Sequence, residues 1–135
     1  ELPCMDGSGA RLALGAPTGL PTVVNLWASW CGPCAKEMPA FVAFAARATG
    51  KARVVGVNTG DDPENAVAAA KDVRVTFANV YDPEQRVRRA LAVPGLPATV
   101  FVTADGRVVH VYNGPALDQP TLELLVEKHL GVVLP

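Results

Sequence analysis

Two cysteines in the run Trp30-Cys31-Gly32-Pro33-Cys34 constrain the fold of this chain more than any other feature. The run just before them, residues 22–28, is apolar and rich in β-branched and aromatic residues, which is typical of a buried strand. After the pair, apolar residues recur at helical spacing, so a helix is expected from Cys34 to about residue 48. The pair is therefore predicted to lie where a buried strand ends and a helix begins.

This position favours redox chemistry at the two sulfurs. Unpaired N–H groups and the positive end of the helix dipole stabilise an anion at a helix N-terminus, so Cys31 is predicted to ionise readily and act as the nucleophile. Cys34 lies three residues on and faces the same side, which makes it the predicted resolving thiol. Pro33 suits an early helical position, and Gly32 leaves the approach to the sulfur uncrowded.

Structural uses of the pair are less consistent with the sequence. A zinc site needs two more ligands at regular spacing, and Cys4, His110 and His129 are distant and unpatterned, so no metal site is predicted. A purely structural disulfide that closes so short a loop would constrain the unfolded chain little. Cys4 is expected to be a small residue of an N-terminal loop, with a bridge to an upstream or external cysteine as the alternative.

Composition narrows the class of protein. Residues 1–135 are long enough for one domain with a sizeable core, and residues 1–20 form an N-terminal segment. The net charge is −1 and no basic stripe with interleaved aromatic residues occurs, so nucleic acid is not an expected partner. The longest apolar run, near residues 23–28, is too short to cross a bilayer. Because the chain begins at Glu1 and not at Met, we expect that a leader or anchor has been removed from it.

The other segments alternate between strand and helix signals. Runs of Asp-Pro-Glu at residues 62–64 and 82–84 predict helix starts, and Asp105-Gly106 predicts a two-residue hairpin. The expected strands lie at a short segment around Leu12 and Leu14 and at 22–28, 53–58, 98–103 and 107–112; the expected helices lie at 34–48, at 62–72, from 82 onward and at 118–131.

Taken in order, these motifs resemble the thioredoxin superfamily. The matching features are Trp-Cys-Gly-Pro-Cys after a buried strand, Pro39 five residues past Cys34, and Pro97 before a late hairpin. Residues 23–31, Lys36-Glu37-Met38-Pro39 and the helix near 62–72 resemble the extracytoplasmic TlpA, ResA and CcmG group more closely. The resemblance implies an α/β thioredoxin-like fold, with a central mixed β-sheet flanked by helices and a TlpA-type helical insert.

The same resemblance implies a thiol-disulfide oxidoreductase that works without a cofactor. Such a protein would be extracytoplasmic and membrane-anchored, and would reduce protein disulfides such as those of apocytochrome c in cytochrome c maturation. A transmembrane thiol reductant of the CcdA type would recharge it. The alternatives are a DsbA-like oxidant, a copper metallochaperone in which Cys31, Cys34 and a His or Met hold Cu(I), and a non-catalytic binding module on the same fold.

Several site residues follow from the resemblance. Pro97 is expected to be a cis-proline against Cys31, with the backbone of Leu96 free to pair with an extended substrate, and Trp30 is expected to form a wall of the site. Together with Gly32 and Pro33 these residues make up the expected substrate-binding set.

The resolving thiol, Cys34, needs a group that accepts its proton. Cytoplasmic thioredoxins carry a buried Asp where this chain has Asn25, and an amide cannot accept the proton of the resolving thiol. Glu37, one helical turn past Cys34, is the candidate replacement, and the alternative is a solvated glutamate that only complements the helix dipole.

Three other side chains are expected to have structural roles. Trp27 is expected in the core, His110 at a surface or sheet edge, and His129 as a partly buried residue near a helix C-terminus.

Overall fold

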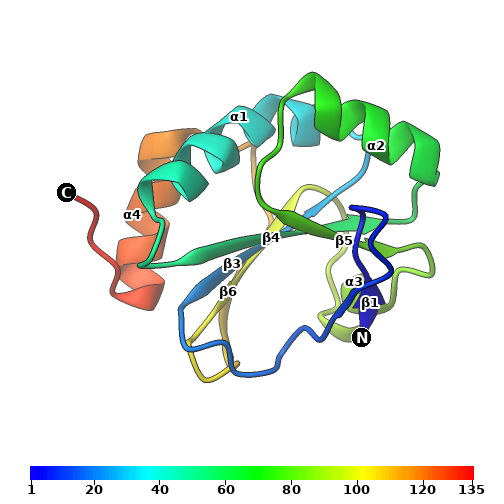
Figure 1. Cartoon of the computed structure of the whole chain (residues 1–135). Helices are drawn as coiled ribbons and strands as arrows, with labels where there is room; N and C mark the ends of the chain where they lie inside the picture. The colour runs from blue at the N-terminus through cyan, green and yellow to red at the C-terminus, as the bar shows by residue number, and fades with distance from the viewer.

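The computed structural model describes residues 1–135 and contains a five-stranded mixed sheet with helices on both faces (Figure 1). The strand order is β5-β4-β3-β6-β7. This is the thioredoxin-like α/β fold expected from the sequence. The strands are β3 (Thr22–Trp27), β4 (Arg53–Thr59), β5 (Ala78–Asp82), β6 (Ala98–Val102) and β7 (Val108–Tyr112).

The central strand β3 is buried along its whole length, as its continuous apolar run predicts. It pairs in parallel with β4 and antiparallel with β6, and the β6 pairing runs from Thr22↔Val102 to Leu26↔Ala98. The C-terminal end of β3 therefore lies beside the first residue of β6. This register brings the Cys31–Cys34 loop and the segment that precedes β6 to the same edge of the sheet.

Three helices lie on one side of the sheet in Figure 1: α1 (Gly32–Arg47), α2 (Pro63–Asp72) and α4 (Gln119–Leu130). The main core joins α1 and α4 to the sheet through large buried side chains. Asp118 caps α4 and Gly131 ends it in the left-handed conformation, as predicted. The residues of this core are Val23, Phe41, Phe44, Ala48, Ala52, Val54, Phe101, Leu117, Leu122 and Val126.

The opposite face of the sheet is covered by short elements. The strands β1 (Leu2–Pro3) and β2 (Arg11–Leu12) pair antiparallel, and the short helix α3 (Arg86–Ala90) packs beside them. Cys4 forms an isolated antiparallel bridge with Val80 and has a free thiol. The N-terminal segment is therefore attached at Cys4 to β5, the edge strand of the sheet.

Two expectations about local structure are wrong, and one element was missed. The helix expected from residue 82 begins only at Arg86, because Asp82 ends β5 and its carboxylate accepts from the N–H groups of Arg86 and Val87. Strand β5 was not predicted. The hairpin forms, but Thr103 and Arg107 close a three-residue loop in place of the expected two-residue turn, with Gly106 at φ +92°.

The two histidines meet on the face of the sheet that α4 covers. The His110 and His129 rings stack with centroids 3.9 Å apart, and each also lies beside Phe101. Because Phe101 pairs with Val23, this cluster lies toward the start of β3, away from the cysteines that follow its other end. Trp27 is buried, as predicted. No helix of this structure has the length and apolar character needed to span a bilayer.

Candidate active site

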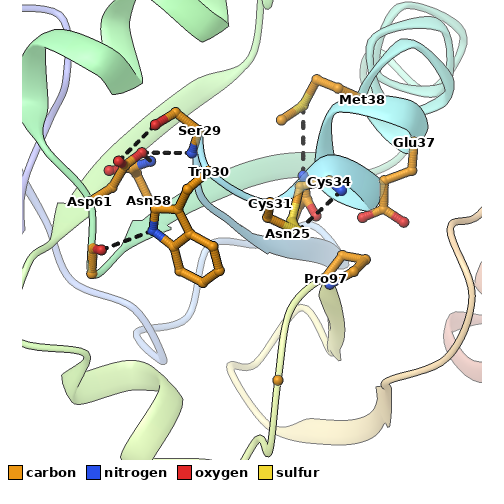
Figure 2. Close-up of a disulfide and its surroundings, with 12 residues drawn as sticks. Asn25, Ser29, Trp30, Cys31, Cys34, Glu37, Met38, Asn58, Asp61 and Pro97 are labelled. Carbon is orange, nitrogen blue, oxygen red and sulfur yellow. Dashed lines mark hydrogen bonds between the residues drawn. A yellow bond between two sulfur atoms is a disulfide. The ribbon is translucent and has the colours of Figure 1, made fainter.

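The two cysteines form a disulfide at the N-terminus of α1 (Figure 2). Cys31 is the N-cap residue, and its Sγ accepts a hydrogen bond from the N–H of Cys34 at 3.2 Å. The helix begins at Gly32, two residues earlier than expected, so Pro33 occupies its second position. Cys31 is 5% exposed and Cys34 only 1%. The outer sulfur thus belongs to Cys31, which fits a nucleophile followed by a shielded resolving thiol.

The space around Gly32 is open. A Cβ atom built on this residue would meet nothing within 4 Å. Gly32 and Pro33 are both exposed, so they form the outer surface of the Cys-x-x-Cys turn. No protein atoms therefore cover the turn at Gly32.

Asn25 and Met38 lie beneath the disulfide turn, between β3 and α1. The Asn25 amide donates to the Met38 sulfur at 3.7 Å, and its Oδ1 atom has no hydrogen-bond partner. Both residues are buried. At this position the protein has a neutral amide, so the proton that Cys34 must lose cannot be taken up by Asn25.

Glu37 is buried in α1, three residues past Cys34. Its side chain is only 1% exposed, so it is not a solvated first-turn residue. The Oε2 atom accepts from the N–H of Leu117 at 3.0 Å, and Oε1 has no partner. Burial raises the pKa of Glu37 from 4.5 to about 7, although the Leu117 hydrogen bond lowers it in part. A carboxyl with such a pKa can exchange a proton near neutral pH.

The Leu96-Pro97 peptide bond is cis. Pro97 is buried immediately before β6, and Leu96 packs against the cluster that contains both cysteines. Figure 2 shows Pro97 beside the disulfide. The fold therefore brings Leu96 and Pro97 to the same edge of the sheet as Cys31 and Cys34.

A network centred on Asp61 holds the loop between β3 and α1, and no motif in the sequence indicates it. The Asp61 carboxylate accepts from the N–H and the hydroxyl of Ser29, both at 2.7 Å, from Asn58 Nδ2 at 3.0 Å and from the N–H of Asp62 at 2.8 Å. Partial burial acts to raise the pKa of Asp61, but these hydrogen bonds outweigh it and hold the pKa below its ordinary value. The carboxylate therefore stays ionised and fixes Ser29, two residues before Cys31.

Trp30 makes a further contact between the loop that precedes α1 and the loop that carries Asp61. Its indole N–H donates to the carbonyl of Gly60 at 3.1 Å, and its side chain is 61% exposed. In Figure 2 the ring lies beside the disulfide turn, toward the loop that carries Asp61. Trp30 is thus a fixed, exposed aromatic surface next to Cys31.

The residues of the site contain no metal-binding cluster. No group of three or more His, Cys, Asp or Glu side chains in this structure is arranged to hold a metal ion.

Comparison with known proteins identifies the family. Residues 1–125 match the Redoxin family. The chain belongs to this family. It is 28% identical to thiol-disulfide oxidoreductase ResA of Bacillus subtilis over 96% of its own length and 70% of that protein's. It is 32% identical to thiol:disulfide interchange protein CycY of Rhizobium leguminosarum over 82% of its own length and 60% of that protein's.

Solved structures agree with this assignment. A secreted disulfide oxidoreductase of Mycobacterium tuberculosis, described as homologous to Escherichia coli DsbE, superposes with a TM-score of 0.82 at 28% identity, over 94% of this chain and 93% of that one. Among sequence relatives, this chain is also 30% identical to thiol:disulfide interchange protein DsbE of Xylella fastidiosa, and it spans 61% of that protein's length. The protein is therefore a thiol-disulfide oxidoreductase of the ResA and DsbE type.

Proposed function

We propose that this protein is an extracytoplasmic reductant of protein disulfides, with the haem-attachment cysteines of apocytochrome c as its substrates. The observation that carries the proposal is the position of Cys31. Its sulfur caps α1 at the edge of the sheet beside Pro97, and Cys34 is buried directly behind it. The kinship with ResA and CycY and the resemblance to the TlpA, ResA and CcmG group support the choice of substrate.

The reaction is a two-electron thiol-disulfide exchange. The Cys31 thiolate attacks one sulfur of the substrate disulfide, forms a mixed disulfide and releases a substrate thiolate, which takes up a proton. Glu37 accepts the proton of Cys34, whose thiolate then attacks Cys31 Sγ and releases the second substrate sulfur. The substrate gains two electrons and two protons, and the protein ends as the Cys31–Cys34 disulfide.

The surroundings of Cys31 favour a reductant over an oxidant. A strong oxidant needs a highly stabilised thiolate on the nucleophile. The Cys31 sulfur accepts one main-chain hydrogen bond, and no Lys, Arg or His side chain bonds to it. An ionised Glu37 on the same helix would disfavour a second negative charge at the sulfurs. Both features favour the disulfide over the dithiol and so lower the reduction potential.

The substrate-binding set comprises Trp30, Gly32, Pro33, Leu96 and Pro97. Gly32 and Pro33 provide open access to Cys31, Trp30 provides an exposed aromatic surface, and Leu96 lies beside the cysteines. An extended substrate segment pairs with the main chain of Leu96. In this proposal a transmembrane thiol reductant of the CcdA type returns the Cys31–Cys34 pair to the dithiol.

Trapping of the mixed disulfide tests this mechanism. A Cys34→Ser variant should accumulate a covalent complex with a disulfide-containing apocytochrome c, visible on a non-reducing gel and dissolved by dithiothreitol. Cys31→Ser is the matched control and should form no complex. Trapping by Cys31→Ser but not by Cys34→Ser would reverse the two roles, and trapping by neither would reject the exchange reaction with this substrate.

A further inference from the structure

The side chain of Asn113 holds the segment on which the proposed substrate would pair. Its Nδ2 group donates to the carbonyl of Gly95 at 3.0 Å and to the carbonyl of Pro97 at 2.8 Å. A side-chain amide has two N–H donors, and this geometry uses both of them. One exposed residue thus bridges the main chain on both sides of Leu96.

Leu96 itself keeps its main-chain groups free. Neither its N–H nor its C=O takes part in any hydrogen bond within the protein. Leu96 is half-buried and packs against the cluster that contains Cys31 and Cys34. The neighbouring carbonyls are already satisfied by Asn113, so Leu96 offers a donor and an acceptor to a partner next to the disulfide.

The position of Asn113 at the end of a sheet strand makes it a rigid support for the Gly95–Pro97 segment. It directly follows β7, whose last residue Tyr112 pairs with Thr99 of β6. Its connection to α4 is fixed further along, where the N–H of Leu117 bonds to Glu37 at 3.0 Å. Asn113 is therefore anchored to the sheet independently of the loop that it holds.

We propose that Asn113 is a positioning residue for polypeptide substrates, which fixes the Gly95–Pro97 main chain so that Leu96 can pair with an extended segment beside the disulfide. This inference rests on the proposed function. A loop fixed before binding loses less conformational entropy when the substrate pairs with it. A small disulfide without a peptide backbone makes no such pairing and gains nothing from Asn113.

The contrast between two kinds of substrate tests the role. Asn113→Leu has a similar size and no donor, and Asn113→Ser can reach at most one carbonyl. The reduced proteins would be mixed in a stopped-flow instrument with a disulfide-closed Cys-x-x-Cys-His peptide, and separately with 5,5′-dithiobis(2-nitrobenzoate). Asn113→Leu should react about tenfold more slowly with the peptide, the scale set by losing two neutral hydrogen bonds, with Asn113→Ser in between. Reaction with the small disulfide, and the reduction potential, should not change.

Tyr112→Phe is the matched control, because it removes only the hydrogen bond from the Tyr112 hydroxyl to the carbonyl of Pro115 and keeps the main-chain pairing of residue 112 with Thr99 that anchors Asn113. It should react like the wild-type protein with both substrates. Equal peptide rates for wild-type and Asn113→Leu, or an equal loss with both substrates, would overturn the role of Asn113. Failure of the wild-type protein to reduce the peptide would overturn the proposed function instead, and this role with it.

Discussion

Glu37 and Leu117 are joined by a hydrogen bond across 80 positions of the chain, from the main-chain N–H that precedes α4 to a carboxylate buried in α1. This bond satisfies one oxygen of Glu37 and leaves the other without a partner. A buried carboxylate with only one donor is costly to ionise. The protein therefore keeps a group near the resolving thiol whose protonation changes in the neutral range.

The raised pKa of Glu37 should make the stability of the folded protein depend on pH. Burial raises the pKa of Glu37 from 4.5 to about 7, so the folded oxidised protein binds a proton that the unfolded chain has lost between these values. The free energy of unfolding should therefore fall as the pH rises through this window, by about 3 kcal/mol for this group. Glu37→Gln should remove that contribution. Urea unfolding of both oxidised proteins at pH 5 and pH 8 measures it.

Glu64→Gln serves as the control, because Glu64 is an exposed residue in the first turn of α2. It should leave the pH dependence of stability as in the wild-type protein. Parallel pH profiles for wild-type and Glu37→Gln would show that Glu37 does not titrate between pH 5 and 8.

The second prediction concerns the role of Glu37 as proton acceptor. Glu37→Gln should slow single-turnover reduction of a peptide disulfide by about 10²-fold above neutral pH, the low end of the usual range for general base catalysis. The inflection near pH 7 in the rate profile should disappear. Glu37→Asp, which keeps a carboxylate, should recover part of the rate. An unchanged inflection in Glu37→Gln would assign it to another group.

The third prediction concerns the loop before Cys31. Asp61 accepts four hydrogen bonds, and an amide at this position would lose acceptor atoms and direct its NH2 group at other donors. Asp61→Asn should lower the free energy of unfolding at pH 7 by about 2 kcal/mol. Because the pKa of Asp61 is held below 3.8 in the folded protein, this difference should shrink as the pH falls below that value.

Denaturant titrations at pH 7 and pH 3 measure the effect of Asp61→Asn. The neighbouring Asp62→Asn is the control, because asparagine also caps a helix well and Asp62 caps α2 through Asn65. Equal stability of the Asp61→Asn and Asp62→Asn variants at pH 7 would argue against the Asp61 network.

The fourth prediction concerns Gly56 in β4. A Cβ atom at this position would overlap Asn79 Oδ1, which accepts from the Trp27 indole at 2.8 Å in the core. Gly56→Ala should therefore break this hydrogen bond and destabilise the protein by about 2–3 kcal/mol, measured by thermal or urea unfolding. Gly32→Ala is the control, because open space surrounds that residue, and it should be close to neutral. Similar stabilities for the two variants would contradict the packing described around Gly56.

The parts of the fold that could be predicted from sequence have local signals. The buried strand β3, the helix N-terminus at the cysteine pair and the capped helix α4 each depend on patterns within a few residues. Strand β5 has the sequence Ala-Asn-Val-Tyr-Asp, in which polar and apolar residues give no clear period, and it was missed. The Asp-Pro run at 82–83 has the composition of a helix start, but Asp82 pairs with Thr59 as the end of β5.

The site residues also divide into those with local sequence signals and those that meet only through long-range contacts. Cys31, Cys34 and Pro97 lie in recognisable motifs, and Glu37 has a known distance from the pair along one helix. The contact of Asp61 with Ser29 spans 32 positions, and that of Asn113 with Gly95 spans 18. A single sequence does not reveal which distant polar residues meet, and Asp, Asn and Ser serve equally well in local caps and turns. These supporting contacts therefore became visible only in the folded structure.

The reduction potential of the Cys31–Cys34 couple decides whether this protein is a reductant or an oxidant, because it sets the direction of electron flow. It can be measured by equilibrating the protein with defined ratios of reduced and oxidised thiol and quantifying the dithiol form. A reductant should have a value near about −270 mV or not far above it. A value near about −120 mV would contradict this account and make the protein an oxidant that forms disulfides in its substrates.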